Sequence, residues 1–290
     1  MSWIKIDADL CTGCETCVSI CGRGCYTMVN GVAEAQADET NCSLCGHCVA
    51  VCPTNAVVHN HMNMAEFKAS EGPDDISTER FIRFIRKRRS HRYFQDREVP
   101  WEVLTQLLDV CRYAPTGSNM QMVEVLVITD RQKIHRLSEL TLDYFRQTML
   151  EVEKEVAELE ASGKEIPIEL AGARDRNPMT RRHLAAWEAG RDPILRSAPV
   201  VLVFHTAPNP STPKDDCVIA AHTVTLTAMT MGLETCYIGL LEKAATDSSK
   251  VLEALELPSD HKVYSVLIAG YPEYEFARPV ARKPIRITRA

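Results

Sequence analysis

The sequence predicts two α+β domains, a small cysteine-rich one followed by a larger one, and three observations lead to this prediction. Eight of the 12 cysteines fall in two short runs with identical spacing near the N-terminus. Beyond them, helix-like periodicity is interspersed with short continuous apolar runs, which are typical of buried strands. A chain of 290 residues is long enough for two domains and a sizeable core. The expected boundaries are 1–62 for the first domain, 63–76 for a linker and 77–290 for the second domain.

The two cysteine runs share the spacing C-x2-C-x2-C-x3-C, from Cys11 to Cys21 and from Cys42 to Cys52. Three thiolates two residues apart let one loop hold three corners of an iron–sulfur cube, and the fourth thiolate completes the other cube. The pattern resembles that of two-cluster bacterial ferredoxins and predicts two 4Fe–4S clusters. The expected ligands are Cys11, Cys14, Cys17 and Cys52 for the first cluster, and Cys42, Cys45, Cys48 and Cys21 for the second.

Two other interpretations of these cysteines fit less well. Zinc sites usually pair cysteines across a longer spacer, and a disulfide framework would need an export signal, which the N-terminal residues do not show. One departure from the ferredoxin pattern is Gly22, because a proline normally follows the fourth cysteine. Cys25 is a spare thiol that we expect to be packed and not to be a ligand.

The charge is unevenly distributed along the chain. The formal net charge is −6, and residues 1–65 hold two basic and six acidic side chains. An acidic first domain suits docking to a basic redox partner, although solubility alone explains it equally well. Many cysteines without a signal predict a cytoplasmic protein with oxygen-sensitive clusters. The longest strongly apolar run, 198–204, is too short to cross a bilayer, so no membrane partner is expected.

The first domain should contain short strands built around the cysteine runs. Strands are predicted at 3–6, 26–29, 32–35 and 56–58. Asn30-Gly31 is a strong signal for a hairpin turn between the second and third. The near-repeat of the runs predicts a pseudo-twofold α+β unit. The stretch from His59 to Asp75 has the composition of a linker, so His59 and His61 are expected to be solvated and not to bind metal.

The second domain should open with a helix near Ser77, which carries Phe81 and Ile85 on one face. From Arg80 to Arg92 the chain has seven basic residues and no acidic one. Such a run could contact nucleic acid, but it is short and its phenylalanines follow a core-packing rhythm. Several guanidiniums beside a hydroxyl also suit a buried phosphomonoester. We favour the phosphate and expect no nucleic-acid partner.

Further helices and strands follow. Pro100 begins a helix that leads into an amide-rich loop at 114–121, and a helix over 216–231 is small or apolar on all sides, as in a core or a subunit interface. His222 in that helix is expected to be a core histidine. Apolar strands are predicted at 123–129, 199–205, 235–238 and 263–269. Core thiols are expected at Cys111, Cys217 and Cys236.

Four segments of the second domain, in this order, resemble flavin-contacting segments of the nitroreductase family. They are Arg88 to Phe94 (RRSHRYF), Ala114 to Gln121 (APTGSNMQ), Ile238-Gly239-Leu240 and Arg282 in the C-terminal tail. The resemblance spans about residues 77–286, and with the first domain the chain resembles ferredoxin–nitroreductase fusions of anaerobes. It departs from the family at Met122-Val123, where Pro-Trp often follows the loop glutamine, so the stacking of a substrate there is in question.

The resemblance implies a nitroreductase-like α+β sandwich with a central mixed sheet. It also implies a homodimer that holds FMN between its two subunits. Carried over, the phosphate and ribityl contacts are Arg88, Ser90 and Arg92, with Arg89 beside them and Arg282 returning to the phosphate. The isoalloxazine contacts are Pro115, Thr116 and Asn119, reaching across from the other subunit if the family arrangement holds, with Gly239 and Leu240 along the ring.

Residues 141–190 form an insertion relative to the family. From Leu142 to Leu159 apolar residues step by three and four, which predicts a long amphipathic helix that must pack on its own body, a dimer mate or the first domain. A second helix would start at Pro178 and carry His183 and Trp187 on one face. This pair could roof the flavin, but an ordinary packed helix is favoured.

The implied activity is that of an FMN-dependent oxidoreductase whose clusters relay electrons to or from the flavin. No side chain needs to be the catalyst. The acceptor would be a small organic molecule, such as a nitroaromatic, a quinone or an activated alkene, and the donor ferredoxin or NAD(P)H. Without a Rossmann fingerprint, NAD(P)H would have to stack on the flavin itself.

Other functions remain open on the sequence alone. The chief alternative is an electron-transfer module between redox proteins with no small substrate of its own, which an insertion covering the flavin would support. Reductive removal of a halogen and fragmentation of the flavin also occur on this fold, and fold alone does not choose among them. Hydrolysis is not expected, because no nucleophile elbow or triad context is present.

Overall fold

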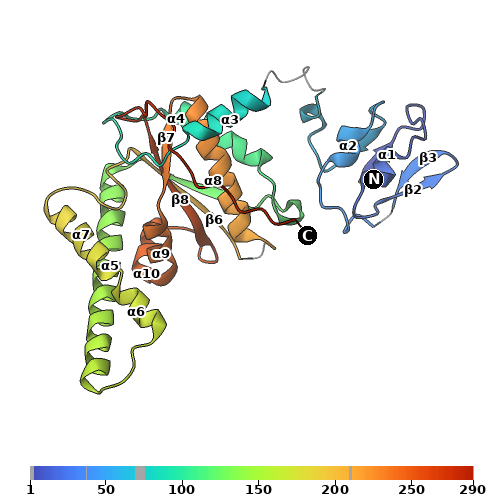
Figure 1. Cartoon of the computed structure of the whole chain (residues 1–290). Coiled ribbons are helices and arrows are strands. Elements are labelled where there is room, and N and C mark those ends of the chain that lie inside the picture. Colours follow the sequence, from blue (N-terminus) through green and yellow to red (C-terminus); the bar gives the residue numbers. More distant parts are fainter. Residues whose placement is uncertain (1–2, 37, 69–75, 209–210, 290) are drawn as a thin grey trace. The chain divides into compact units, whose positions relative to one another are not determined.

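The computed structural model describes residues 3–36, 38–68, 76–208 and 211–289, and Figure 1 traces them. The chain forms two compact units. The first comprises Met1–Ile76 with Ser118–Met120, and the second comprises Ser77–Gly117 with Gln121–Ala290. Half of the predicted linker, residues 69–75, lies outside the described residues. Each unit is a mixture of short strands and helices, and the α+β class is therefore confirmed.

The first unit consists of two small antiparallel sheets and two one-turn helices. Strand β1 (Ile4–Ile6) pairs with β4 (Val57–His59), and β2 (Tyr26–Val29) pairs with β3 (Val32–Ala35). The β2–β3 turn has positive φ at Asn30 (48°) and Gly31 (81°), as the predicted hairpin requires. The helices are α1 (Thr16–Ile20) and α2 (His47–Val51), with a 3-10 turn η1 at Met64–Glu66. One cysteine run leads into each helix, so the expected pseudo-twofold arrangement is present.

The second unit is organised around one four-stranded sheet in the order β5-β6-β8-β7. Its strands are β5 (Glu124–Ile128), β6 (Val200–Thr206), β7 (Glu234–Tyr237) and β8 (Lys262–Gly270). All pairs are antiparallel, so the expectation of a mixed sheet is wrong for the described residues. The reason is topological. The helix after β6 returns the chain so that β7 runs parallel to β6, but β8 inserts between them and pairs antiparallel with both.

Helices cover both faces of this sheet (Figure 1). Alternate residues of β6 point to opposite faces of the sheet and pack into two separate hydrophobic cores. Val201 and Val203 pack with one set of helices, while Val200, Leu202 and Phe204 pack with the other. The first face is covered by the start of α5 (Arg131–Ala161) together with α9 (Gly239–Asp247) and α10 (Ser249–Leu255). The second face is covered by α4 (Trp101–Asp109) and α8 (Pro213–Thr230). Two 3-10 turns, η2 (Val110–Tyr113) and η3 (Gly117–Asn119), follow α4.

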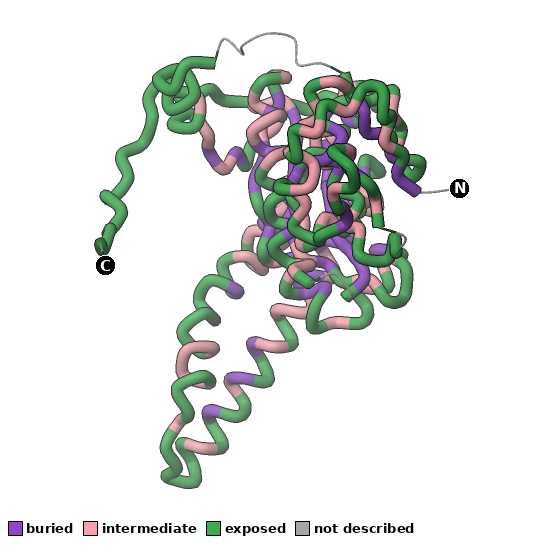
Figure 2. The backbone as a smooth tube through the Cα atoms, turned by 90° about the vertical axis from the view of Figure 1, so that its right-hand side faces the viewer, coloured by how far each residue is buried: buried purple, intermediate pink, exposed green. Residues whose placement is uncertain are grey.

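The insertion forms an arm of three helices that extends beyond the sheet of its own unit (Figures 1 and 2). They are α5 (Arg131–Ala161), α6 (Ile168–Arg174) and α7 (Asn177–Glu188). The apolar seam of α5 is buried at Met149, Val152 and Val156, where α6 and α7 pack against it. The ring centroids of Trp187 and of His135 on α5 are 4.7 Å apart. The favoured interpretation, an ordinary packed helix, therefore agrees with the position of Trp187.

Two helices of the second unit leave apolar side chains exposed. Helix α3 (Thr78–Lys87) exposes Phe81 and Ile82, each by 49%, and α8 exposes Val218 and Ile219. His222 on α8 is exposed as well, so its expected core position is wrong; α8 buries only the face that carries Ala220, Ala221 and Val224. Cys217 and Cys236 are buried as expected. None of the helices in the described ranges has the length and hydrophobicity needed to cross a membrane.

Candidate functional site

Four thiols from both cysteine runs line one cavity in the first unit. Three of them, Cys11, Cys14 and Cys17, come from the first run, and Cys52 comes from the end of the second. Burial raises the pKa of the Cys17 thiol, and the nearby Cys52 and Cys11 thiols raise it further. These are the four residues that the spacing predicts for the first cluster. The repeat places Cys52 there because α2 carries it away from its own loop.

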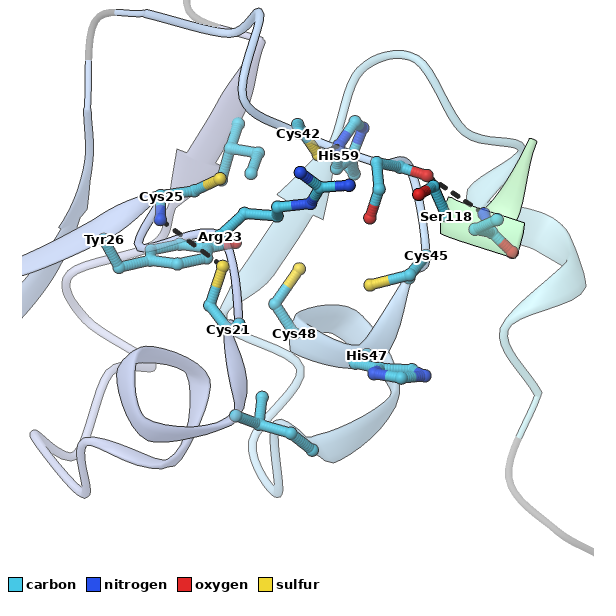
Figure 3. Close-up of a pocket in the computed structure, with 16 residues that line it drawn as sticks. Cys21, Arg23, Cys25, Tyr26, Cys42, Cys45, His47, Cys48, His59 and Ser118 are labelled. Atoms are coloured by element: carbon cyan, nitrogen blue, oxygen red, sulfur yellow. Dashed lines mark hydrogen bonds between the residues drawn. The ribbon is translucent and has the colours of Figure 1, made fainter. Parts of the chain in front are cut away.

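A second set of thiols lines another cavity of the same unit, shown in Figure 3. Cys42, Cys45 and Cys48 come from the second run and Cys21 from the end of the first, and their sulfur atoms turn toward one space. Cys25 is buried and lines this cavity too. Its expected packing is seen, but it is a fifth thiol beside the four predicted ligands.

Polar groups around both cavities are aimed at the sulfur atoms. The backbone N–H of Ala56 donates to Cys52 Sγ over 3.2 Å, and that of Cys25 donates to Cys21 Sγ over 3.4 Å. Thr16 Oγ1 donates to Cys14 Sγ over 3.4 Å. Thiolates gain most from such donors, and four convergent thiolates are the donor set of a 4Fe–4S cube. The residues present therefore fit two clusters.

His59 is a member of the second cavity that the sequence interpretation missed. It was expected in a solvated linker, yet it is fully buried at the end of β4, paired with Ile4 of β1. The backbone N–H of His61 donates to His59 Nδ1 over 3.3 Å, so His59 Nε2 carries the ring proton and faces Cys42 Sγ at 3.6 Å. Burial alternates along β4, with Val57 and His59 buried and Val58 exposed, but the residue types do not alternate, so the sequence carried no local signal that the strand continues to His59.

In the second unit, three of the predicted phosphate-binding arginines line one cavity of about 700 Å³. Arg88 and Arg89 follow the last turn of α3, and Arg282 reaches the same cavity from the C-terminal segment. The chain leaves the helix at Arg88, whose ψ of 131° is extended, so the two neighbouring arginines are presented from non-helical backbone. We call this space the arginine cavity.

Arg89 has no counter-ion among the described residues. It is 8% exposed, and its Nη1 donates to the Arg88 carbonyl over 2.8 Å. Its Nε and Nη2 atoms are buried with no hydrogen-bond partner. A buried guanidinium without partners costs several kcal/mol, roughly the penalty of an unpaired buried charge. An anion bound beside Arg89 would remove this penalty.

His91 and Glu234 form a largely buried pair close to Arg88 and Arg89. His91 Nε2 is 3.4 Å from Glu234 Oε2, and the His91 backbone N–H donates to the Thr235 carbonyl. Burial raises the pKa of Glu234 to about 7, partly opposed by Arg88. Burial also lowers the pKa of His91, and Arg89 and Arg88 lower it further. Both members of the pair are thus biased toward their neutral forms, which weakens the compensation of the arginine charge by Glu234.

The other predicted flavin contacts lie on separate elements. Ser90 is half-buried, Arg92 is exposed, and neither lines the arginine cavity. Gly239 and Leu240 begin α9, and a Cβ placed on Gly239 would meet nothing within 4 Å. This open space beside the backbone fits the close approach of a planar ring.

The loop that carries Pro115 and Thr116 is fixed by a buried carboxylate. Asp216 of α8 accepts from the Gly117 N–H over 2.9 Å and from Thr212 Oγ1 over 2.8 Å. A Cβ on Gly117 would come within 2.3 Å of Thr212 Oγ1, so any larger residue would have to displace this hydroxyl, which is bonded to Asp216. Asn119, also predicted to contact flavin, groups with the first unit and is not in the same unit as Pro115 and Thr116.

Comparison with known families gives a family match for each of the two units. A model of the nitroreductase family matches residues 85–271, well over half of the chain. The chain belongs to the nitroreductase family. A model of a 4Fe-4S dicluster domain matches residues 10–56, and this match agrees with the two four-thiol cavities. This nitroreductase-family protein therefore carries an iron–sulfur domain at its N-terminal side, as the resemblance implied, and the predicted enzyme class is confirmed.

Individual relatives match one or the other unit of this nitroreductase-family protein. A 4-nitrobenzoate reductase from Nocardioides sp. is 26% identical over 73% of this chain and 91% of its own length. An FMN-bound nitroreductase structure from Bacteroides fragilis covers 72% of this chain and 97% of its own, with 22% identity and a TM-score of 0.53, and supports the fold. A probable iron–sulfur subunit of the frd operon of Proteus vulgaris is 36% identical over 18% of this chain. In three of the iron–sulfur relatives the match spans only 14% to 45% of the relative's length.

Proposed function

We propose that the protein is an iron–sulfur flavoprotein that binds two 4Fe–4S clusters and FMN and reduces a small organic acceptor. The observation that carries the proposal is the buried guanidinium of Arg89, whose Nε and Nη2 have no hydrogen-bond partner, in a cavity shared with Arg88 and Arg282. A phosphomonoester is the anion that such a group of arginines binds best. Two sets of four thiols in the same chain would provide the path for single electrons.

The residues of this chain would divide the work of holding the cofactors. Arg88, Arg89 and Arg282 would bind the FMN phosphate, with Ser90 and Arg92 toward the ribityl chain. The ring would lie against Gly239 and Leu240, with Pro115, Thr116 and Asn119 as further contacts. Bound FMN supplies the exchange of one or two electrons with donor and acceptor. The eight cysteines already described would hold the clusters, the first set around Cys11 and the second around Cys42.

A nitroaromatic compound is the acceptor class with most support, because the 4-nitrobenzoate reductase covers most of the chain. Quinones and activated alkenes are the other acceptors to test, since a flavin can reduce each of them. The donor is reduced ferredoxin or NAD(P)H. The number of free thiols supports a reducing, cytoplasmic location, and the exposed Cys14 and Cys45 sites suit an anaerobic setting.

The exposed apolar side chains of α3 and α8 support a homodimer. Phe81 and Ile82 are each 49% exposed in the single chain, Val218 and Ile219 are 37% and 39% exposed, and Ile285 in the C-terminal segment is 83% exposed. Apolar surface of this kind is typical of a contact with another protein, and symmetric homodimers are the commonest solution. The nitroreductase fold of the second unit agrees with this assignment.

Anaerobic stopped-flow spectroscopy tests the proposal. The purified protein is reduced stoichiometrically and mixed separately with NAD(P)+, nitrobenzoate, a quinone and an enone, while flavin and cluster absorbance are followed. Rapid reoxidation by one organic class would establish the enzyme and its acceptor. Reoxidation only by a redox protein would replace it by the electron-transfer module. Purification without flavin, together with failure to bind added FMN, would contradict the cofactor assignment.

A further inference from the structure

Three residues with metal-binding side chains meet at one edge of the second unit's sheet. Glu124 is the first residue of β5, His205 lies near the end of β6, and His261 directly precedes β8. One potential ligand atom from each of the three lies within 4.8 Å of the other two. None of them lines the arginine cavity or either thiol cavity. The function proposed above therefore leaves this group unexplained.

The sheet itself builds this arrangement. Glu124 and His205 are directly paired across β5 and β6, so their side chains project from the same face. The register of β6 against β8 shifts between Phe204 and His205, which is an irregularity of the bulge type. Bulges re-aim a side chain locally. His205 thereby faces His261 in the turn before β8.

The two imidazoles face each other through the same kind of atom. His205 Nδ1 is 2.8 Å from His261 Nδ1, and His261 Nε2 is 4.0 Å from Glu124 Oε1. Two nitrogen atoms at this distance must share one proton or one cation, because two donors or two lone pairs would repel. His205 is 3% exposed, so its ring is almost entirely enclosed by protein and its nitrogen atoms depend on partners within this group.

We propose that Glu124, His205 and His261 form a site for one divalent transition-metal ion of the zinc type. Two imidazole nitrogens and one carboxylate oxygen are a ligand set that zinc uses with water in the fourth position. Nitrogen ligands disfavour Mg²⁺ and Ca²⁺, which take oxygen. On binding, the proton that lies between the two rings would move to the other nitrogen of the ring that carries it, so both imidazoles would stay neutral and the oxidation state of the metal would not change.

The metal would hold three segments of the sheet together. Glu124 is preceded by the loop that carries Pro115 and Thr116, so a metal on Glu124 would fix the end of that loop to β6 and to the start of β8. Bound zinc should therefore raise the midpoint of thermal unfolding, because a ligand that binds only the folded chain stabilises it.

Anomalous diffraction and zinc binding test the site in the whole protein with its cofactors, kept anaerobic. After soaking with one equivalent of Zn²⁺, an anomalous difference peak that appears only above the zinc edge is expected among Glu124, His205 and His261. Equilibrium dialysis should show one zinc per chain fewer in His261→Ala than in the wild type, and at least about tenfold weaker binding in Glu124→Gln. His222→Ala, an exposed histidine on α8, is the matched control and should bind zinc as the wild type does.

Zinc taken up by cluster thiols would appear equally in all these variants and would not affect the comparison. The melting temperature of each variant without added zinc shows whether it is folded. The proposal is overturned if no zinc peak appears at the three side chains, or if folded His261→Ala binds as much zinc as the wild type with the same affinity. In that case the two histidines are a hydrogen-bonded pair and nothing more.

Discussion

The thiol cavities and the arginine cavity are built on opposite principles. Each thiol cavity takes three residues from one short loop and the fourth from the other run, and backbone N–H groups are directed at the sulfurs. The arginine cavity joins the end of α3 to Arg282, near the opposite end of the second unit's chain, and leaves Nε and Nη2 of Arg89 without a hydrogen-bond partner. The first kind of site is specified locally, whereas the second depends on the whole fold and on its ligand.

The largest expected effect is on the iron content, and it distinguishes the thiol cavities from the arginine cavity. Cys45→Ser should lower the iron content by about half, because a cube that loses one thiolate ligand is not held. The flavin content should not change, since the arginines belong to the other unit. Metal analysis and flavin absorbance of the purified variant provide the measurement. Cys25→Ala is the control and should keep all the iron; full iron in Cys45→Ser would show that the second cluster is assigned wrongly.

The substitution Arg89→Met should weaken the binding of FMN and, at the same time, stabilise the flavin-free protein. Loss of two charge-assisted hydrogen bonds should weaken FMN binding by roughly 10²- to 10⁴-fold. Without flavin, the same variant should unfold at a higher denaturant concentration than the wild type, because a buried unpaired charge has been removed.

Fluorescence titration with FMN and urea unfolding of the flavin-free protein measure the two effects. Arg136→Met, on an exposed arginine of α5, should change neither. An unchanged FMN affinity in Arg89→Met would place the flavin phosphate elsewhere in the molecule.

The His91–Glu234 pair predicts that the stability of the protein depends on pH. The Glu234 carboxyl, ordinarily near pKa 4.5, keeps its proton to about 7 in the folded state. The folded chain therefore binds more protons than the unfolded chain between these values, and stability falls as the pH rises through this window. Relative to Glu234→Gln, the wild type should lose about 2 kcal/mol of unfolding free energy between about pH 5 and about pH 8.

Urea unfolding at several pH values measures this difference. The contribution of His91 is shared by both proteins and largely cancels. Parallel pH profiles for the two proteins would mean that Glu234 titrates normally.

The smallest expected effect is on the second cluster. His59→Leu removes the Nε2–H that faces Cys42 Sγ, and a donor to a cluster thiolate stabilises the more negative, reduced state. The reduction potential of one cluster should therefore fall by tens of millivolts, on the order expected for one hydrogen bond. Spectropotentiometry measures it, with His61→Leu as the control. An equal shift in both variants would assign the effect to general electrostatics.

Local patterns predicted local structure well. The hairpin at Asn30-Gly31, the strands of both units and the long α5 helix followed from turn chemistry and periodicity. His59 was misplaced because its burial depends on β1, more than fifty residues earlier in the chain. His222 was misplaced because an apolar helix does not reveal which of its faces the sheet covers.

The site of the second unit was only partly accessible from sequence. Motif resemblance brought Arg88, Arg89 and Arg282 into one hypothesis, and the fold places them around one cavity. The antiparallel sheet and the role of Asp216 depend on strand order and on contacts between distant segments, for which the sequence carries no local signal.

Asp216 also has a consequence for behaviour at low concentration. One buried carboxylate holds both the loop at Gly117 and the first turn of α8, whose outer face exposes Val218 and Ile219. In the proposed dimer that face would be covered, so subunit association and the order of the loop would share one anchor. Flavin would then dissociate more readily from a dilute solution than from a concentrated one, and the apparent affinity would depend on the amount of enzyme present.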